Sequence, residues 1–531
     1  MTAHNQPPGS SRTTCCGADV RGRRQLADRL TVMVINSGWK AKHEPVEYPS
    51  RFSGSSRDRT TAPTSTMPDP DPAGVVEPRD WSGETASTDR QPQEPLMRRM
   101  PGLLLIAGWC LAAMPPGGNG WTSEPINPDS TANVQRPSVD DWSQFRGPGG
   151  QGHSLAEDLP LNWSESKNVT WKSAVEGTGW SSPVTREKQI WLTTSLEQGK
   201  SLLVICLDRT TGRQLHRIAI FGSQMTRGLH PKNSHASPTP ILEGDRVYVH
   251  FGPYGTACLT TDGKLVWKTR LAYKTLYGPS SSPVLVDDLL IVQCHGTDVR
   301  FVTALDKKTG KPRWRRSHDA RSPKLQRHNS ESTPLVIHTP AGSQLICNVA
   351  GHVLSYEPQT GESLWSVQQQ ENYAQVPRPV YGHQLLFTAG GYFSPVVQAI
   401  RPGGRGDITK SHVVWSVRKA VPNNPSPLLV GDELYMVSDK GIGSCLDART
   451  GQLRWRERLG GNYSASPIFA DGRIYFANEE GVTTVLAPGP RFRKLASNKL
   501  DGRIMASPAV SGKAIYLRTD HHLYRIERKP D

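Results

Sequence analysis

The sequence predicts an all-β fold, namely an eight-bladed β-propeller built from four-stranded blades. A short phrase recurs every 40 to 55 residues, the length of one such blade: Ser or a close substitute followed by Pro, with a turn marked by Gly or an acidic residue and two or three apolar residues. Short β-rich runs alternate with turn residues, and no stretch keeps a helical period. The prolines that mark the eight repeats are Pro183, Pro238, Pro283, Pro334, Pro379, Pro427, Pro467 and Pro508.

The first 140 residues do not belong to the repeat. Residues 1–96 are rich in Pro, Ser, Thr and Arg and hold equal numbers of acidic and basic residues, so the net charge of +15 lies downstream. Such a composition cannot bury a core, which predicts disorder or a leader created by a miscalled start site. Residues 121–140 are predicted to be a linker.

A targeting signal is predicted at residues 97–120. Met97 opens a basic start, which is followed by an apolar run from Leu103 to Ala113 and then a Pro- and Gly-rich exit. This order is typical of a secretory signal peptide and predicts a periplasmic or extracellular protein. The apolar run is short for a membrane span, so no transmembrane segment is expected in the mature chain. A genuine long leader or a short internal anchor is the alternative.

The repeat that begins at Pro427 shows the four strands of a blade most clearly. Three apolar runs, Leu428–Val430, Leu434–Val437 and Ser444–Leu446, are separated by turns, and a fourth run carries Trp455. An Asp-x-x-x-Gly hairpin precedes the fourth run. In that hairpin the Asp side chain is expected to bond nearby backbone amides, and Gly supplies a positive φ.

A tryptophan recurs on the fourth strand of most repeats, where a large aromatic ring is expected to wedge between neighbouring blades. The first repeat has His216 at this place, and the seventh has no tryptophan near Arg493. The predicted structural tryptophans of the repeats are Trp267, Trp314, Trp365, Trp415 and Trp455.

The last repeat lacks its fourth strand at the C-terminal end of the chain. A strand-like run, Val169–Lys172, stands before the first repeat without a blade of its own and contains Trp171, a sixth structural tryptophan. Pairing this N-terminal strand with the last blade closes the ring and leaves no open sheet edge. The propeller is therefore predicted to span residues 141–531, as a monomer.

The repeat signature resembles that of the pyrroloquinoline quinone (PQQ) repeat propellers. It reads Ala-Leu-Asp-x-x-Thr-Gly over 304–310 and is followed by Trp314. The resemblance covers most of the chain after residue 140 and implies the propeller fold. A phrase at 141–148 is similar to one that opens many secreted bacterial members, and its Trp142 and Phe145 are expected to pack at the ring closure.

The resemblance leaves the function open, because one propeller serves enzymes, scaffolds and sensors. In the quinone-dependent dehydrogenases of the family it implies PQQ, calcium, an Asp base and two adjacent bridged cysteines. The adjacent cysteines of this chain, Cys15 and Cys16, lie outside the propeller. We therefore expect a non-catalytic binding or scaffold module for a protein or an acidic glycan, with no catalytic residue and no cofactor. The alternatives are an oxidoreductase with PQQ, calcium or another metal on its axis, and an outer-membrane protein assembly factor.

A candidate binding site follows from the repeats themselves. The residue three positions before each blade proline is expected near the central channel, and Arg378 and Tyr463 are expected beside it. Together they predict a funnel for a small polar ligand or a cation, with Glu331 and Asn424 as oxygen donors. The alternative is a wet channel without a ligand. The candidate ligand-binding residues are Trp180, His235, Glu331, Arg378, Asn424 and Tyr463.

Two basic clusters are the other candidate surfaces, and a positive patch attracts acidic partners such as a polysaccharide. A solvated face is the alternative for each. Nucleic acid is not expected as a partner, because it conflicts with the export signal and no known nucleic-acid module is present. One cluster comprises Arg313, Arg315, Arg316, Arg321 and Lys324, and the other comprises Arg227, His230 and Lys232.

Overall fold

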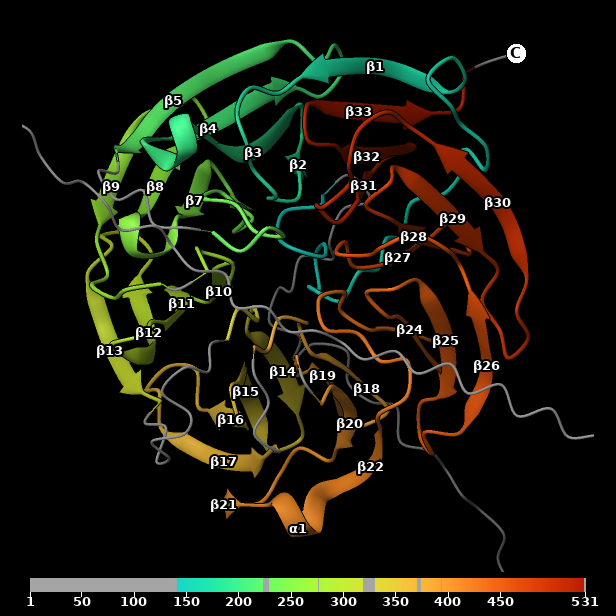
Figure 1. The fold of residues 1–531 in the computed structure, drawn as a ribbon. Coiled ribbons are helices and arrows are strands. Elements are labelled where there is room, and N and C mark those ends of the chain that lie inside the picture. The colour runs from blue at the N-terminus through green and yellow to red at the C-terminus, as the bar shows by residue number, and fades with distance from the viewer. Residues whose placement is uncertain are drawn as a thin grey trace, which may run out of the picture. The chain divides into compact units, whose positions relative to one another are not determined.

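Eight sheets, seven of four strands and one of five, surround a central axis in the computed structural model, which confirms the predicted propeller (Figure 1). The residues that the structure describes are 141–222, 229–275, 277–318, 330–369, 374–392 and 394–529. The predicted leader, signal peptide and linker lie outside them, as do Arg227, Arg321 and Lys324. No helix in this part of the chain is long and apolar enough to cross a membrane.

Each blade runs outward in chain order from a short inner strand to an outer strand. The first four blades are β2 (Val184–Arg186), β3 (Gln189–Leu196), β4 (Ser201–Asp208), β5 (Gln214–Gly222); β6 (Ile241–Glu243), β7 (Arg246–His250), β8 (Thr256–Thr260), β9 (Leu265–Thr269); β10 (Val284–Val286), β11 (Leu289–His295), β12 (Arg300–Asp306), β13 (Pro312–Ser317); and β14 (Leu335–Thr339), β15 (Gly342–Val349), β16 (His352–Tyr356), β17 (Ser363–Gln368).

The remaining blades follow the same order, except that the last takes its outer strand from the start of the propeller. They are β18 (Val380–Gly382), β19 (Leu385–Gly390), β20 (Val396–Ile400), β22 (Val413–Val417); β23 (Leu428–Val430), β24 (Glu433–Val437), β25 (Ile442–Asp447), β26 (Leu453–Arg458); β27 (Ile468–Ala470), β28 (Arg473–Ala477), β29 (Val482–Leu486), β30 (Lys494–Lys499); and β31 (Ala509–Ser511), β32 (Ala514–Arg518), β33 (His522–Glu527), β1 (Val169–Ala174). Short additions are α1 (Thr409–His412), β21 (Gly406–Asp407), η2 (Glu197–Gly199) and η3 (Gly252–Tyr254).

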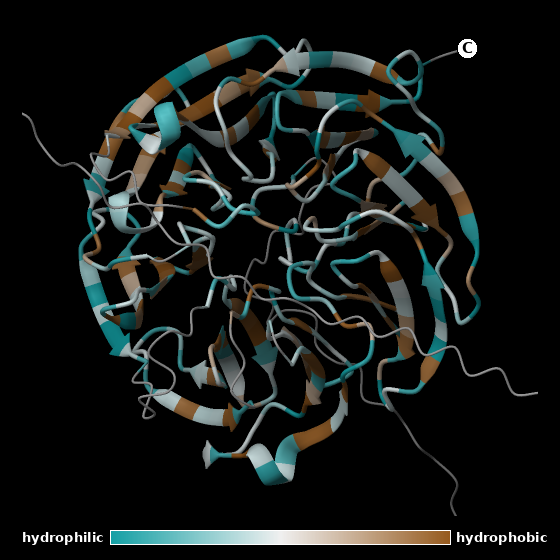
Figure 2. Ribbon diagram, in the orientation of Figure 1, coloured by the Kyte–Doolittle hydropathy of each residue, from teal (hydrophilic) through white to brown (hydrophobic). Residues whose placement is uncertain are grey.

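Burial changes from the middle to the rim of a blade. In the sixth blade, β24 is buried along most of its length, because neighbouring blades cover both of its faces. The outer strand β26 buries Trp455 and exposes most of its other side chains. Figure 2 shows the hydrophobic positions as bands along the strands. The hydrophobic core is therefore a set of interfaces between blades, each repeated around the ring.

The outer-strand tryptophans join consecutive blades through one repeated contact. The indole Nε1 of Trp314 donates a hydrogen bond to the Pro358 carbonyl of the next blade (3.0 Å). Its ring lies over Gly361, where a Cβ atom would come within 2.7 Å of it. The hairpin glycine therefore allows both the tight turn and the close packing of the tryptophan ring from the preceding blade, which together form the joint between two blades. The same contact pairs Trp267 with Gly310, Trp415 with Gly451 and Trp171 with Gly212.

Other joints differ from this contact. His216 replaces the tryptophan in the first blade, where it packs against Gly263 of the second blade. Trp365 instead donates to Gln344 Oε1 of its own blade (2.8 Å), and its backbone pairs with the additional strand β21. The repeat therefore tolerates a different aromatic residue, or a different partner, at individual joints.

The seventh blade receives its tryptophan from elsewhere in the chain. Ala496 stands opposite Val485, at the position where other blades carry tryptophan. Trp163, which precedes the first blade, stacks on Tyr475 with ring centroids 6.3 Å apart, and its backbone N–H donates to Asn498 Oδ1 (2.9 Å). The N-terminal segment thus supplies the missing aromatic side chain.

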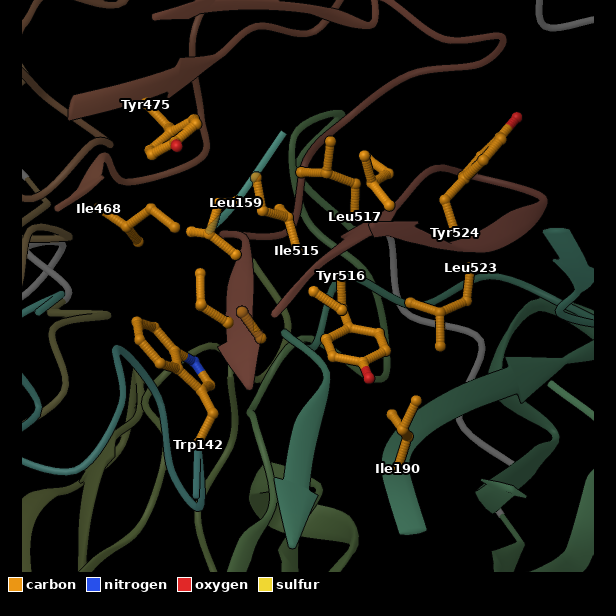
Figure 3. Packing of buried hydrophobic residues seen from close by; sticks show 14 of the residues in the cluster. Trp142, Leu159, Ile190, Ile468, Tyr475, Ile515, Tyr516, Leu517, Leu523 and Tyr524 are labelled. Carbon is orange, nitrogen blue, oxygen red and sulfur yellow. The ribbon is translucent and has the colours of Figure 1, made fainter. Parts of the chain in front are cut away.

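The predicted ring closure is confirmed. The N-terminal strand β1 pairs antiparallel with β33, with Ala174 opposite His522. A buried cluster joins the first, seventh and eighth blades to the N-terminal segment, and it contains Trp142, Ile190, Ile468 and Tyr516 (Figure 3). The first and last strands of the propeller therefore close it by a shared sheet, and apolar packing adds to this closure.

Candidate functional site

An axial funnel occupies the centre of the propeller, with a cavity of about 850 Å³. Its wall is built where the chain enters the inner strands, because these entry points converge on the axis. Seven of the eight residues that stand three positions before a blade proline line it: Trp180, Ser280, Glu331, Val376, Asn424, Ser464 and Met505.

One end of the funnel, which we call the closed end, is covered by the segment 141–153. Its backbone bonds to inner strands of several blades: Trp142 N–H to the Thr185 carbonyl (3.1 Å), and Phe469 N–H to the Gly152 carbonyl (2.7 Å). Trp142 packs in the ring-closure cluster as predicted, whereas Phe145 lines the axial cavity.

A buried arginine holds this segment in place. The Nη2 group of Arg146 donates to the carbonyls of Gln151 and Pro427 (2.9 Å each). Burial, together with the positive charge of Arg378, lowers the pKa of Arg146 to about 9. At neutral pH it still carries a charge, which is balanced by backbone dipoles.

Arg378 is the second buried cation of the closed end. It donates from Nη1 to the Phe145 carbonyl (2.8 Å) and from Nε to the Pro334 carbonyl (3.1 Å). Burial lowers its pKa to about 9. Its guanidinium lies against Gly150, where a Cβ atom would overlap it. Arg378 therefore ties two blades to the N-terminal segment and lies below the cavity.

The opposite end, which we call the mouth, is crossed by Lys232. This residue precedes the second blade, yet its Nζ lies 2.7 Å from Glu479 Oε1 of the seventh blade and 3.9 Å from Asp439 Oδ1 of the sixth. Burial would raise the pKa of Glu479, but the Lys232 ammonium and the Ser464 hydroxyl outweigh it and lower that pKa. Lys232 thus links opposite sides of the ring.

The carboxylates of the mouth also hold the chain at the entry to their own blades. Asp439 accepts hydrogen bonds from the Asn423 backbone N–H (2.7 Å) and from the Asn424 side-chain amide. Glu479 accepts from the Ser464 hydroxyl (2.7 Å). These contacts fix the backbone of the wall, so the mouth presents a preorganised polar surface.

Three of the six predicted site residues lie on the funnel wall: Trp180, Glu331 and Asn424. Burial raises the pKa of Glu331 to about 8, against a smaller lowering by the Ser280 hydroxyl. The Oε1 atom of Glu331 and the Nε1 atom of Trp180 are buried and have no hydrogen-bond partner among the described residues. These atoms are available to a ligand or to water.

The other three predicted residues do not line the cavity. His235 is buried between the first two blades, beside Gly199 and within 3.2 Å of the Tyr254 hydroxyl. Tyr463 is fully buried and presents only its backbone carbonyl to Lys232. Arg378 binds the closed end. Packing between blades, rather than position in the repeat, sets the direction of these side chains.

Sequence reasoning missed the acidic residues of the mouth. Asp439 and Glu479 each stand two residues after the second strand of their blade, and Asp520 occupies the same place in the eighth. This recurrence could have identified them. In the sequence Lys232 belongs only to a basic cluster, because nothing there shows that its side chain crosses the axis.

The described members of the other basic cluster are held by their neighbours. Arg313 pairs with Asp306 (2.9 Å), and Arg315 lies 3.5 Å from the centre of the Phe301 ring. Arg316 donates to the Gly361 carbonyl (2.7 Å). These contacts serve the outer strand β13, and they agree better with a solvated face than with a binding patch.

The comparisons with known proteins agree with the fold. A family model described as outer membrane protein assembly factor BamB matches residues 117–292, 164–387 and 300–530. BamB of Burkholderia pseudomallei (strain K96243) is 33% identical over 109 residues, 20% of this chain and 28% of that protein. BamB of Legionella pneumophila (strain Paris) is 25% identical over 214 residues, 39% of this chain and 50% of that protein. These matches span half or less of the relatives' own length.

Among solved structures, a europium-containing methanol dehydrogenase resembles this chain in fold, with a TM-score of 0.56 at 10% identity. The likeness covers 72% of this chain and 89% of the enzyme. Because the family model matches most of the chain, the protein belongs to the PQQ-like propeller family that is described as outer membrane protein assembly factor BamB.

Proposed function

We propose that this chain is an exported, non-catalytic scaffold that binds a partner polypeptide at the mouth of its axial funnel. Its curated relatives are, by name, assembly factors for outer membrane proteins, which supports a scaffold among exported proteins. Because the matches cover only part of those relatives, the kind of partner that their name suggests is itself part of the proposal. An acidic glycan is the competing ligand.

The network of Lys232, Glu479 and Asp439 is the observation that carries the proposal. Each carboxylate already has a cationic or hydrogen-bonding partner. Such a surface can bind without first reorganising, which lowers the entropic cost of association. The funnel behind it has room for side chains of a bound segment.

The oxidoreductase alternative requires residues that can hold a quinone and a metal. Calcium prefers several oxygen ligands with net negative charge. At Asp439 and Glu479 the ammonium of Lys232 already supplies the positive charge, 2.7 Å from Glu479 Oε1. Glu331 offers one carboxylate on another part of the wall. The acidic pair therefore does not fit a calcium site, and we assign no oxidation step.

A photoreactive amino acid at Lys440 tests the proposal directly. Lys440 is exposed beside the mouth, whereas Leu453, the matched control position, is exposed on the outer strand β26. In envelopes of the native cell, we expect crosslinks from position 440 to components of the outer-membrane protein assembly machinery. Crosslinks only from position 453, or crosslinks to glycan alone, would overturn the proposal.

A substitution at the mouth sharpens the same experiment. Lys232→Met removes the ammonium between Glu479 and Asp439 and is expected to reduce the crosslink yield severalfold. Lys264→Met makes the same chemical change at an exposed lysine of the second blade and should leave the yield unchanged. Equal yields from both variants would contradict a role for the mouth.

The enzyme alternative has a separate test. PQQ and calcium are added to the purified protein, and quinone absorbance and dye-linked alcohol oxidation are measured. Stoichiometric quinone uptake together with alcohol-dependent dye reduction would contradict the non-catalytic proposal, whereas neither signal is expected.

A further inference from the structure

A second, much smaller cavity lies behind the funnel wall, between the second and third blades. Its volume is about 10 Å³, which is room for a single sphere of about water size. Glu331 and Ser280 line both this cavity and the funnel, so the two spaces share a wall. The small cavity is also lined by Ser281, Gln293, His295, His250 and Tyr273.

Four of the lining side chains have a buried polar atom that lacks a hydrogen-bond partner in the described part of the chain. They are Ser281 Oγ, Gln293 Oε1, His295 Nδ1 and Glu331 Oε1. Buried polar atoms in native proteins nearly always find a partner, in the protein or in a bound molecule. Four unpaired atoms on residues that line one water-sized space therefore indicate an occupant that bonds to them.

Two of these side chains are fixed by hydrogen bonds at their other end. The Gln293 amide donates from Nε2 to Ser330 Oγ (3.0 Å) and to the Ser332 carbonyl (3.1 Å). The ring of His295 bonds through Nε2 to His318 Nδ1 (2.9 Å). Neither group can turn away from the cavity without losing a buried hydrogen bond. The site is thus preorganised for its occupant.

The charge of the cavity lining allows its occupant at most a single positive charge. Glu331 is the one carboxylate among the described lining residues. Burial lowers the pKa of His250 to about 4 and that of His295 well below its ordinary value, so both rings are neutral at neutral pH. Burial also raises the pKa of Tyr273, so its phenol is neutral too. A divalent ion would leave an unbalanced buried charge.

We propose that this cavity binds one water-sized monovalent cation, potassium or ammonium, between the Glu331 carboxylate, Gln293 Oε1, Ser281 Oγ and His295 Nδ1. Glu331 supplies the balancing charge, and the other three atoms supply lone pairs. On binding, the Glu331 carboxyl releases its proton to solvent as the cation enters and a water molecule leaves. The cavity therefore stays neutral in both states. This inference is independent of the proposed partner binding at the mouth.

The exchange of a proton for a cation makes binding depend on pH. Burial raises the pKa of Glu331 to about 8, so the cation competes with a proton below that pH and binds more tightly above it. The other titratable or charged groups near the cavity are His250 and Tyr273, the pair His295 and His318, the thiol Cys294 beside Tyr273, and Arg300 beside His295.

Thermal unfolding in matched salts tests the proposal. Melting temperatures of the full chain are compared at pH 8.5 and pH 6 in potassium, ammonium and choline chlorides of equal ionic strength, since choline is too large for the cavity. We expect an increase of about 2 °C in potassium or ammonium over choline at pH 8.5, and a smaller one at pH 6. The cation that gives the higher melting temperature, potassium or ammonium, is the preferred ligand. Equal melting temperatures in all three salts would mean that the cavity holds only water, which overturns the proposal.

Variants locate the effect. Glu331→Gln should abolish the difference between salts, and Ser281→Ala should weaken the apparent cation affinity about 10-fold while retaining the carboxylate. Glu362→Gln, an exposed carboxyl on the rim, should behave as the wild type. A salt effect that persists in both cavity variants would place the cation elsewhere. Crystals soaked in thallous ions, which mimic potassium and scatter anomalously, should show a peak in the cavity, and the absence of a peak would overturn the proposal.

Discussion

The two ends of the axial funnel are built from different kinds of contact. At the closed end, Arg146 and Arg378 are buried and donate to backbone carbonyls of several blades. At the mouth, Lys232 is partly exposed and pairs with acidic side chains. Buried groups that bond to several blades contribute to global stability, whereas partly exposed ion pairs contribute little. The comparison indicates that the closed end maintains the fold and that the mouth can vary without unfolding the protein.

The largest expected effect concerns Trp142, which is fully buried at the closed end. Trp142→Ala removes a large ring from the cluster that joins the first, seventh and eighth blades and should lower the free energy of unfolding by about 3–5 kcal/mol. Equilibrium urea denaturation measures the loss. Leu453→Ala, at a side chain 48% exposed on the rim, is the control and should change it by about 0.5 kcal/mol or less. Equal losses would contradict the assignment of stability to the closed end.

Arg378→Met should have the next largest effect. The change leaves the carbonyls of Phe145 and Pro334 without their donor and should cost about 3 kcal/mol by the same measurement. If the variant is as stable as the wild type, Arg378 does not help to hold the segment 141–153 in place.

A substitution at Gly150 separates backbone strain from steric overlap at the closed end. Gly150 has φ +66°, and a Cβ atom there would overlap the Arg378 guanidinium. Gly150→Ala should cost about 2 kcal/mol. Gly472, with φ +65° and open space around it, provides the matched control, and Gly472→Ala should cost about 1 kcal/mol. Identical costs would show that Arg378 moves aside freely.

The smallest effect is expected at the mouth, where Lys232→Met should lower stability by about 1 kcal/mol or less at neutral pH. The folded-state pKa of Glu479 is lowered, so its contribution is present above the unfolded pKa of about 4.3 and is lost as the pH falls through the folded value. Without the Lys232 ammonium this lowering shrinks, so the variant should lose less stability between pH 5 and pH 3. Denaturation across that range measures the slope, and an unchanged slope would show that Lys232 does not act on Glu479.

The repeat made most of the fold predictable from the sequence. The number of blades and the pairing of β1 with the last blade follow from regular spacing and from one unpaired strand. The direction of individual side chains was less predictable. His235 turns away from the axis because Gly199 leaves space for its ring between blades. Lys232 reaches the far side of the mouth through a tertiary contact that no local pattern encodes.

The position of Trp163 has a consequence for the timing of folding. This residue and β1 are synthesised before any blade, yet their partners Tyr475 and β33 come at the end of the chain. Contacts so distant in sequence form slowly, and they cannot form during synthesis until the last blade has emerged. Trp163 and β1 therefore stay without these partners for most of elongation, and ring closure becomes the final step of folding.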